Sequence, residues 1–217
     1  IISYVDDLVK SNHAYLADGD VYFRVSSISN YGDLSGNTVE SLISGARIEV
    51  NSKKESSLDF ALWKKTDEGI KWNSPFGEGR PGWHTECCVM INSIFSNQDG
   101  FIDIHGGGFD LKFPHHENEI AQSRAHNNNR LARYWIHNGF INIDNQKMSK
   151  SLGNVLNAKD VIAQWGGMPF RLMVLNTHYR APLSFTNETI EEAVKSYAKI
   201  NQTIKGLAIK LQLADID

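Results

Sequence analysis

The sequence predicts an α/β fold in which strands alternate with helices around a parallel sheet. Residues 58–178 alternate short apolar runs with segments of helical periodicity, the pattern of a parallel α/β sheet. Residues 101–119 show one unit of this pattern, a strand followed by three glycines and a helix start. The 217-residue chain is 41% hydrophobic, which is ample for a sizeable core.

Composition narrows the classes of function. The net charge of −3 argues against a uniformly basic surface for nucleic acid, although a local patch remains open. No apolar run approaches the roughly 18 residues of a membrane span. The two cysteines, Cys87 and Cys88, are adjacent, and disulfide geometry disfavours a bridge between neighbours. We therefore expect a reducing, cytoplasmic setting without membrane contact.

The first 57 residues are expected to form a small α+β unit. Ile1–Lys10 has the apolar spacing of a helix, and no signal peptide precedes it, so we expect an internal piece of a longer protein. Two β-rich runs flank Asp18-Gly19-Asp20, which predicts a hairpin. Asn37 resembles an N-cap with a carboxylate three residues later, and Gly45 is a candidate helix end. Residues 51–57 are polar and charged, typical of a loop or boundary.

The central part of the chain supplies most of the predicted strands and helices. The pattern first indicates a strand at 59–63, irregular glycine- and proline-rich backbone at 72–82 and a helix at 83–95. A strand at 101–104 follows, and short apolar runs occupy 131–143. A polar stretch at 144–154 then leads to helices at 157–165 and 168–178. Pro182 then breaks the chain, and residues 187–213 are typical of a long amphipathic helix.

The glycine triplet Gly106-Gly107-Gly108 is a candidate ligand cradle. Three glycines give backbone freedom and no Cβ, so a ligand can lie against the main chain. Pro114 stands where a first helical position is expected, because its missing N–H is not needed there. A strand that leads to a helix N-terminus favours anions such as phosphate. The alternative is that the triplet is an ordinary loop.

A metal site is suggested by residues on two predicted helices. His115 and Glu119 are four residues apart and share a helix face, as do Trp83 and Cys87. Cys87, His115 and Glu119 offer a sulfur, a nitrogen and an oxygen, all acceptable to Zn²⁺, whereas the lack of a CxxC pair excludes a four-cysteine structural site. The alternative is that Cys87 is a small buried hydrophobe and Glu119 a solvated helix residue. Cys88 is a rival ligand, but its neighbour Val89 suggests that this face turns into the core.

Two further groups of residues are candidates for chemistry. Four histidines close in sequence are expected around one pocket, whereas three others are expected at the surface. The first four are His84, His105, His115 and His116, and the other three are His13, His126 and His178. The loop Lys147-Met148-Ser149-Lys150-Ser151 carries two lysines and two hydroxyls, suited to holding a pyrophosphate as charge develops. The alternative is a solvated turn.

These residues carry a resemblance to a known family. Lys147–Ser151 resembles the KMSKS signature of class I aminoacyl-tRNA synthetases, and the stretches Gly82–Cys87 and Asp103–Glu119 closely resemble the cysteinyl-tRNA synthetase family. The resemblance covers nearly the whole chain. It implies a connective insertion at residues 1–57, the second half of a Rossmann-like class I catalytic core at 58–178, and the start of a helical tRNA-contacting domain at 179–217.

The resemblance also implies roles for single residues. Three of them match zinc ligands, for a single Zn²⁺ that binds the thiolate of the substrate cysteine: Cys87, His115 and Glu119. Trp83 matches the aromatic wall of that pocket, and His84 and His116 match its histidine floor. The residues that match the adenosine-contacting strand end and loop are His105, Gly106, Gly107, Gly108 and Asp110. Lys150, with Lys147 nearby, matches the lysine that stabilises the triphosphate.

The implied activity is the ATP- and Mg²⁺-dependent activation of L-cysteine to cysteinyl-adenylate and its transfer to tRNA(Cys), by a cytoplasmic, monomeric enzyme. The family's N-terminal half with the HIGH motif, its fourth zinc ligand (a cysteine) and most of its anticodon-binding region have no match here. We therefore expect residues 1–217 alone not to charge tRNA. The alternatives are a mycothiol-pathway cysteine ligase with the same adenylation chemistry and an amino-sugar acceptor, and a non-catalytic module stabilised by zinc.

Overall fold

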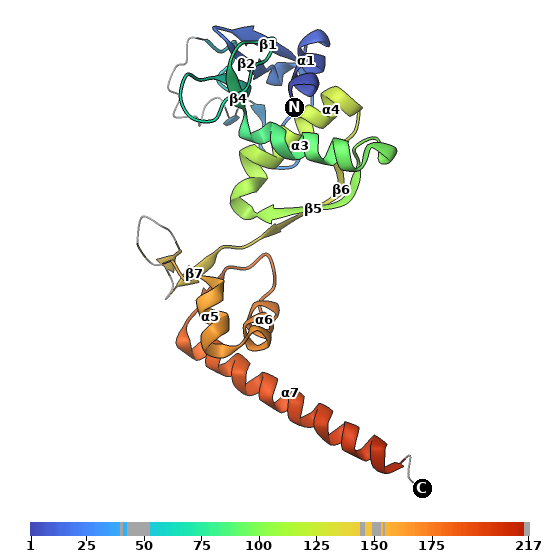
Figure 1. Ribbon diagram of the computed structural model, residues 1–217, viewed down its shortest axis with the longest axis vertical. Helices are drawn as coiled ribbons and strands as arrows, with labels where there is room; N and C mark the ends of the chain where they lie inside the picture. Colours follow the sequence, from blue (N-terminus) through green and yellow to red (C-terminus); the bar gives the residue numbers. More distant parts are fainter. Residues whose placement is uncertain (40, 43–52, 144–145, 149–152, 154, 215–217) are drawn as a thin grey trace. The chain divides into compact units, whose positions relative to one another are not determined.

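The computed structural model divides the chain into two compact units, Ile1–Ile136 and His137–Asp217 (Figure 1). The residues that it describes are 1–39, 41–42, 53–143, 146–148, 153 and 155–214. The domain boundaries expected after residue 57 and after residue 178 both differ from the boundary between these units. Residue 57 is not a boundary because one sheet of the first unit takes strands from both sides of it.

A four-stranded antiparallel sheet organises the first unit, in the order β1-β2-β3-β4. Its strands are β1 (Ala14–Ala17), β2 (Asp20–Phe23), β3 (Phe60–Lys65) and β4 (Gly79–Pro81). Between β1 and β2, Asp18 and Gly19 have φ values of 52° and 85°. Two successive residues with positive φ form the tight turn whose twist suits a hairpin, so the expected hairpin is confirmed.

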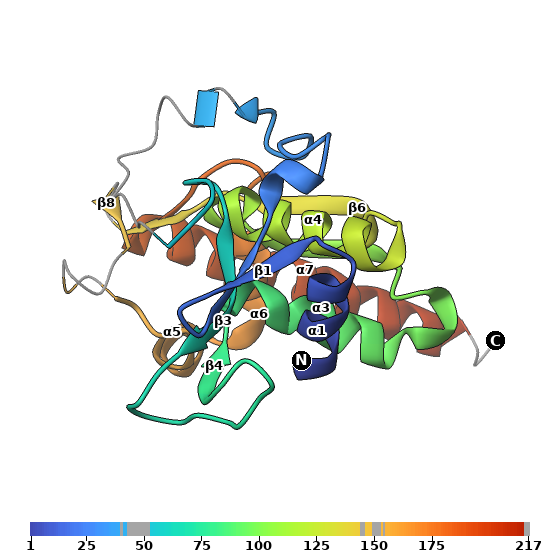
Figure 2. The same cartoon turned by 90° about the horizontal axis from the view of Figure 1, so that it is seen from above.

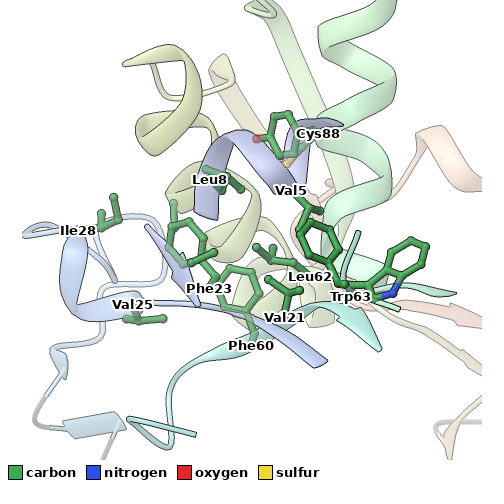
Figure 3. Close-up of a cluster of buried hydrophobic side chains, with 14 of the residues drawn as sticks. Val5, Leu8, Val21, Phe23, Val25, Ile28, Phe60, Leu62, Trp63 and Cys88 are labelled. Carbon is green, nitrogen blue, oxygen red and sulfur yellow. The ribbon is translucent and has the colours of Figure 1, made fainter. Parts of the chain in front are cut away.

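Three helices pack with this sheet around one core: α1 (Ile2–Lys10), α3 (Trp83–Ile94) and α4 (Glu117–Asn127) (Figures 1 and 2). The helix expected at the start of the chain is therefore present, and its Val5 and Leu8 are fully buried. Figure 3 shows both side chains among residues of the strands, such as Phe23 and Leu62. Each such fully buried side chain contributes roughly 1.5–3 kcal/mol to stability.

A parallel pair of strands, β5 (Ile102–Gly108) and β6 (Ala132–Asn138), forms the other sheet of this region. The N–H of Ile102 donates to Leu131 O at 2.9 Å, and a Cβ placed on Gly106 would meet Ile136 O at 3.6 Å. Residue numbers rise in the same direction along both strands, from 102 beside 131 to 106 beside 136, so the strands are parallel. The α/β class is confirmed, but parallel pairing occurs in β5–β6 and not in the antiparallel sheet β1–β4.

The glycine triplet belongs to β5 and not to a loop after it, which corrects the expectation from the sequence. None of Gly106, Gly107 and Gly108 has a positive φ, so the backbone freedom of glycine is not what these positions require. After the short turn η3 (Phe109–Leu111), Phe113 is extended within the next turn, η4 (Lys112–His116). Helical backbone begins at Pro114, the expected first helical position, and continues into α4.

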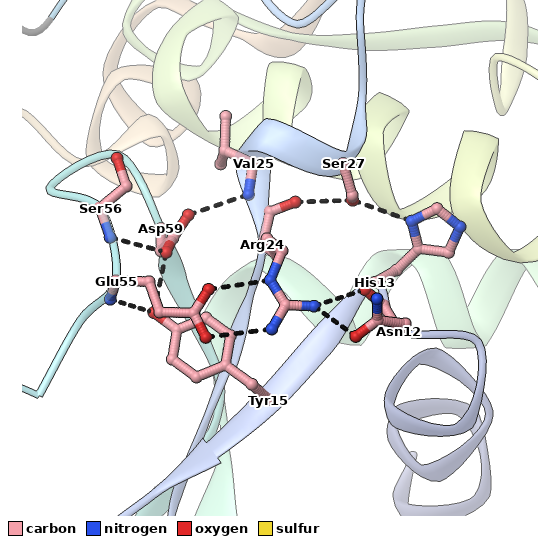
Figure 4. Close-up of polar contacts among 9 residues, drawn as sticks. All are labelled: Asn12, His13, Tyr15, Arg24, Val25, Ser27, Glu55, Ser56 and Asp59. Carbon is pink, nitrogen blue, oxygen red and sulfur yellow. Dashed lines mark hydrogen bonds and ion pairs between the residues drawn. The ribbon is translucent and has the colours of Figure 1, made fainter.

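Polar contacts fix the chain around β3 (Figure 4). Asp59 is 1% exposed and accepts hydrogen bonds from the N–H of Val25 at 2.9 Å and the hydroxyl of Tyr15 at 2.8 Å. Arg24, which precedes the short turn η1 (Val25–Ser27), donates to both carboxylate oxygens of Glu55 at 2.9 and 3.0 Å. These contacts hold the polar stretch before β3 against the first hairpin.

The segment after η1 is held by α4 and leads to a helix start at Thr38. The Tyr31 hydroxyl donates to Asn118 Oδ1 at 2.6 Å, and the Ser35 N–H donates to Glu117 Oε2 at 2.8 Å. Thr38 and Ser41 cap reciprocally, each hydroxyl accepting the other's N–H at 3.1 Å. The cap is therefore one residue later than the Asn37 expected from the sequence. The expected carboxylate at position 40 and helix end at position 45 lie outside the described residues.

The second unit combines a small sheet with three helices. Its strands are β7 (Ile141–Ile143), β8 (Gln146–Lys147) and β9 (Leu183–Phe185), with β7 antiparallel to β8 and parallel to β9. Its helices are α5 (Ala158–Trp165), α6 (Gly167–Leu175) and α7 (Asn187–Ala214), which confirm the three helices expected here. Their core contains Val161, Met173, Phe185 and Ile190. Across the described residues, no helix combines the length and apolar character needed to cross a membrane.

Candidate metal centre

Three elements of the first unit bring the candidate ligands together: the first turns of α3, the strand β5, and the turn η4 with the start of α4. The alignment of α3 and α4 is fixed by polar contacts between them. The side-chain amide of Gln122 donates to His84 O at 2.7 Å, and the thiol of Cys88 lies 3.6 Å from Glu119 O. Cys88 is fully buried and belongs to the hydrophobic core, so it does not face the site.

Cys87, His115 and Glu119 form one group of ligand atoms, all within 4.8 Å of one another. The three side chains that the resemblance implies as zinc ligands therefore lie together in the structure. Glu119 is fully buried, and its Oε1 atom lies 3.1 Å from His115 Nε2 but accepts no aligned hydrogen bond from a described residue. A buried carboxylate oxygen without a partner is costly unless a cation binds it. The S, N and O donor set, with that unpartnered oxygen, fits Zn²⁺.

The local electrostatics suit a cation. Burial alone would raise the pKa of Glu119, but His105 and His115 beside its carboxylate lower it to about 2. Burial, followed by the negative charge of Glu119, raises the pKa of the Cys87 thiol to about 11. The protein without metal therefore holds a carboxylate next to a protonated thiol at neutral pH. A metal ion that binds here displaces the thiol proton, and its positive charge offsets the negative charge of Glu119.

An aromatic and histidine wall borders the three ligands. Trp83 is 60% exposed, and its ring centroid lies 4.4 Å from that of His115. The Nδ1 atoms of His84 and His115 are 2.8 Å apart, so one donates and the other accepts. Burial, with the nearby His115, lowers the pKa of His84 to about 4, so His84 is neutral at pH 7. A neutral His84 can accept the Nδ1–H of His115, which leaves His115 Nε2 free to bind a metal.

A second group of ligand atoms lies beside the first and shares Glu119: His105, His116 and Glu119. His105 Nε2 is 2.8 Å from Glu119 Oε2, and the ring of His105 lies 4.8 Å from that of His116. The four histidines expected around one pocket are therefore together. Sequence reasoning missed Trp135 of β6, whose ring lies 4.8 Å from His105 and 5.1 Å from His116. In the sequence, Trp135 could be noticed only as an aromatic residue within the short apolar runs at 131–143.

The glycines of β5 make space for this group. A Cβ on Gly107 would lie 2.8 Å from His116 Cε1 and 2.9 Å from Leu111 Cδ1. Gly107 is therefore required by the close approach of the His116 ring and not by an unusual φ. Gly106 and Asp110 are exposed, so both are accessible to a ligand outside the protein core.

The expected lysine loop belongs to the second unit, and the structure does not relate it to these ligands. Lys147 lies on β8, while Lys150 falls outside the described residues. His126 and His178 are exposed, as expected, and His13 is half-buried with its Nδ1 atom 2.8 Å from the hydroxyl oxygen of Ser27.

A cavity of about 1130 Å³ in the first unit does not contain the candidate ligands. It lies between α1, the sheet and the opposite face of α3, where its wall includes Trp63, Trp72 and Met90. Its lining is mainly apolar, and the candidate metal ligands Cys87, His115 and Glu119 are not part of it. We take Cys87, His115 and Glu119 as the candidate functional site, because their metal-binding atoms converge.

Comparisons with known proteins identify the family of this chain. The family described as tRNA synthetases class I (C) catalytic domain matches residues 1–195. A protein of Acholeplasma laidlawii named cysteine–tRNA ligase is 52% identical over 217 residues, which are all of this chain and 49% of that protein. One of the same name from Staphylococcus aureus is 49% identical over 99% of this chain and 46% of that protein. The chain thus spans about half the length of the curated relatives it matches.

Solved structures support the fold. A putative arginyl tRNA synthetase from Campylobacter jejuni matches with a TM-score of 0.51 and 15% identity, over 84% of this chain and 32% of that one. A leucyl enzyme of Agrobacterium radiobacter K84, solved in a ternary complex with tRNA, matches with a TM-score of 0.50 and 15% identity, over 65% and 23%. The family match covers most of the chain, and the relatives agree with it. This chain therefore belongs to the family of class I (C) tRNA synthetase catalytic domains.

Proposed function

We propose that this chain carries the cysteine-selecting centre of an enzyme that joins L-cysteine to tRNA(Cys) with ATP. The observation that supports the proposal most directly is the convergence of Cys87, His115 and Glu119 beside the exposed Trp83 ring. Relatives about half identical to the chain and named cysteine–tRNA ligase support the same function. The solved structure of the leucyl relative with tRNA supports a tRNA partner for the fold.

The proposed zinc ligands are Cys87, His115 and Glu119. When bound, Zn²⁺ supplies a soft centre that prefers a thiolate to a hydroxyl as an added ligand. Recognition of a group that the competitor lacks rejects serine by roughly 10⁴–10⁵ without an editing site. Trp83 would close one side of the pocket, and His84 and His116 would form its floor. Because His84 is neutral at pH 7, it adds no positive charge that would oppose the metal.

The proposed nucleotide contacts come from β5 and the turn after it, and from the lysine loop. The residues that we place beside adenosine are His105, Gly106, Gly107, Gly108 and Asp110. The cysteine carboxylate would attack the α-phosphate of ATP and break its bond to the β-phosphate, so that pyrophosphate leaves with the Mg²⁺. Lys147 and Lys150 would stabilise the charge on the leaving pyrophosphate.

The test is cysteine-dependent ATP–pyrophosphate exchange, followed by an acceptor assay, on the full-length protein. We expect exchange with L-cysteine, no detectable exchange with L-serine, and charging of tRNA(Cys). Lys150→Ala should reduce exchange by roughly 10²–10³-fold, the size typical of losing one group that stabilises developing charge. A cytoplasmic location and a monomeric state remain predictions.

Two outcomes would replace this function with another. Exchange with transfer of cysteine to an amino sugar instead of tRNA would identify a small-molecule ligase. A complete lack of exchange in a folded, zinc-loaded wild-type protein would indicate a non-catalytic module, and Lys150→Ala would then change nothing.

A further inference from the structure

The two carboxylate oxygens of Glu119 have different surroundings. Oε2 is 2.8 Å from His105 Nε2, in a hydrogen bond between α4 and β5. Oε1 lies 3.1 Å from His115 Nε2 but has no aligned hydrogen bond from any described residue. The side chain of Glu119 has no exposed surface. One oxygen is thus held, and the other is directed at the group formed with Cys87.

The ring of His105 is itself held in place. Its side chain is 16% exposed. The ring of Trp135 on β6 meets it edge to face, with centroids 4.8 Å apart and an interplanar angle of 83°. The ring of His116 lies on another side, with centroids 4.8 Å apart and an angle of 52°. Packing against two rings restricts rotation of His105, which makes its hydrogen bond directional.

The direction of this hydrogen bond follows from its chemistry. A carboxylate oxygen accepts, so His105 Nε2 donates its hydrogen to Oε2. This hydrogen bond directs Nε2 at the Glu119 carboxylate, so His105 acts on the metal site through Glu119.

We propose that His105 is a positioning residue for the metal site, which holds Glu119 so that Oε1 alone is presented to the ion together with Cys87 and His115. The inference rests on the proposed zinc site and adds a role for His105 beyond nucleotide contact. Outer hydrogen-bond partners of this kind typically change metal affinity by about 10–100-fold.

The test compares His105→Ala with His105→Gln in the full chain. The glutamine amide can donate an N–H to Oε2, whereas alanine cannot. His178→Ala, an exposed histidine of the second unit, is the control. The zinc dissociation constant is measured by competition with a chelator, and the Co²⁺-substituted protein is examined by visible absorption, which reports the geometry of the ligands. Circular dichroism confirms folding of each variant.

We expect His105→Ala to raise the zinc dissociation constant about 10–100-fold and to alter the Co²⁺ spectrum, with His105→Gln restoring most of both and His178→Ala changing neither. Wild-type affinity in His105→Ala, with only ATP binding weakened, would overturn the inference and leave the zinc site standing. If His105→Gln did not restore zinc affinity and Cys87→Ser kept its zinc, His105 would be a metal ligand, and this result would also overturn the inference. Lack of zinc binding by the wild-type chain would instead overturn the site and this inference together.

Discussion

Cys87 and Cys88 are neighbours in the sequence with opposite environments in the fold. Successive residues of an α-helix differ by about 100° around its axis, so adjacent side chains on α3 cannot share a face. Cys88 packs in the core, whereas Cys87 is half-buried and faces His115 and Glu119. A step of one residue along the helix thus separates a structural thiol from a candidate ligand.

The first prediction concerns this pair. Cys87→Ser should lower both the zinc content and the affinity for cysteine, because a hydroxyl stays protonated and is a poor ligand for zinc. Metal analysis and calorimetry measure the two effects. The matched variant Cys88→Ser should keep zinc but lose about 1–3 kcal/mol of folding stability, since it buries a hydroxyl in the core. Zinc lost from the Cys88 variant and kept in the Cys87 variant would reverse the assignment.

Asp20 gives a prediction for pH. It is 5% exposed, and burial alone would raise its pKa, but hydrogen bonds from Lys64, Tyr22 and the Lys65 N–H lower it below the usual value. A lowered pKa in the folded state stabilises the fold above the unfolded pKa and loses that contribution as pH falls through the folded pKa.

Asp20→Asn should therefore cost about 1–3 kcal/mol at pH 7 and progressively less below pH ~4, as wild-type Asp20 becomes protonated. Urea denaturation between pH 3 and pH 7 measures the difference. Asp18→Asn is the control, because its side chain is 74% exposed in the same hairpin. A constant difference across this pH range would show that the Asp20 charge does not stabilise the fold.

At the scale of elements, the strand β5 depends on the absence of side chains at its end. Gly107→Ala should destabilise the protein by about 1–3 kcal/mol, since the new Cβ would overlap His116, which is 2% exposed and cannot easily move. Gly106→Ala should cost little, because its Cβ would meet only Ile136 O at 3.6 Å. Thermal unfolding measures both. Equal effects of the two substitutions would show that the contact with His116 is not what requires glycine.

The sequence predicts elements better than it predicts the contacts between them. The four-residue spacing of His115 and Glu119 predicted that they share a face, because a helix fixes which residues do so, whereas their meeting with Cys87 was implied only by the resemblance. The bond from His105 to Glu119 and the packing of Trp135 were not predicted. Both depend on the pairing of β5 with β6 and on how that pair meets α4, which short apolar runs do not encode.

The start of α4 also anchors a distant segment, and this anchor is testable. Glu117 is 1% exposed and accepts the N–H of Ser35 at 2.8 Å. Glu117→Gln replaces a charged acceptor by a neutral one, which should weaken a hydrogen bond of about 1.5–3 kcal/mol. The Ser35 amide should then exchange with deuterium about tenfold faster. Glu86→Gln, exposed on α3, should leave it unchanged, and unchanged exchange in the Glu117 variant would contradict the anchor.

At the scale of the molecule, the two units differ in what holds them. The first has a mixed core of sheet and helices, with the ligand group built on it. The second has a smaller core, and its α7 runs on with an apolar stripe that was predicted from periodicity. Ile200, Ile204, Leu207 and Leu211 of this stripe are 46–68% exposed. The pattern predicted the helix correctly, but periodicity does not say what covers its apolar face.

This division predicts where zinc acts. All three proposed ligands lie within Ile1–Ile136, so zinc that binds the folded state should stabilise that unit by mass action, by about 2.7 kcal/mol at a free concentration 100 times the dissociation constant. Hydrogen exchange of the full chain, with and without zinc, should show slower exchange in α3, α4 and β5 and no change in α5 and α6. In Cys87→Ser the zinc effect should disappear at the same metal concentration. Equal protection of α5 and α6 would mean that the two units unfold together, and protection confined to α5 and α6 would place the metal outside the first unit.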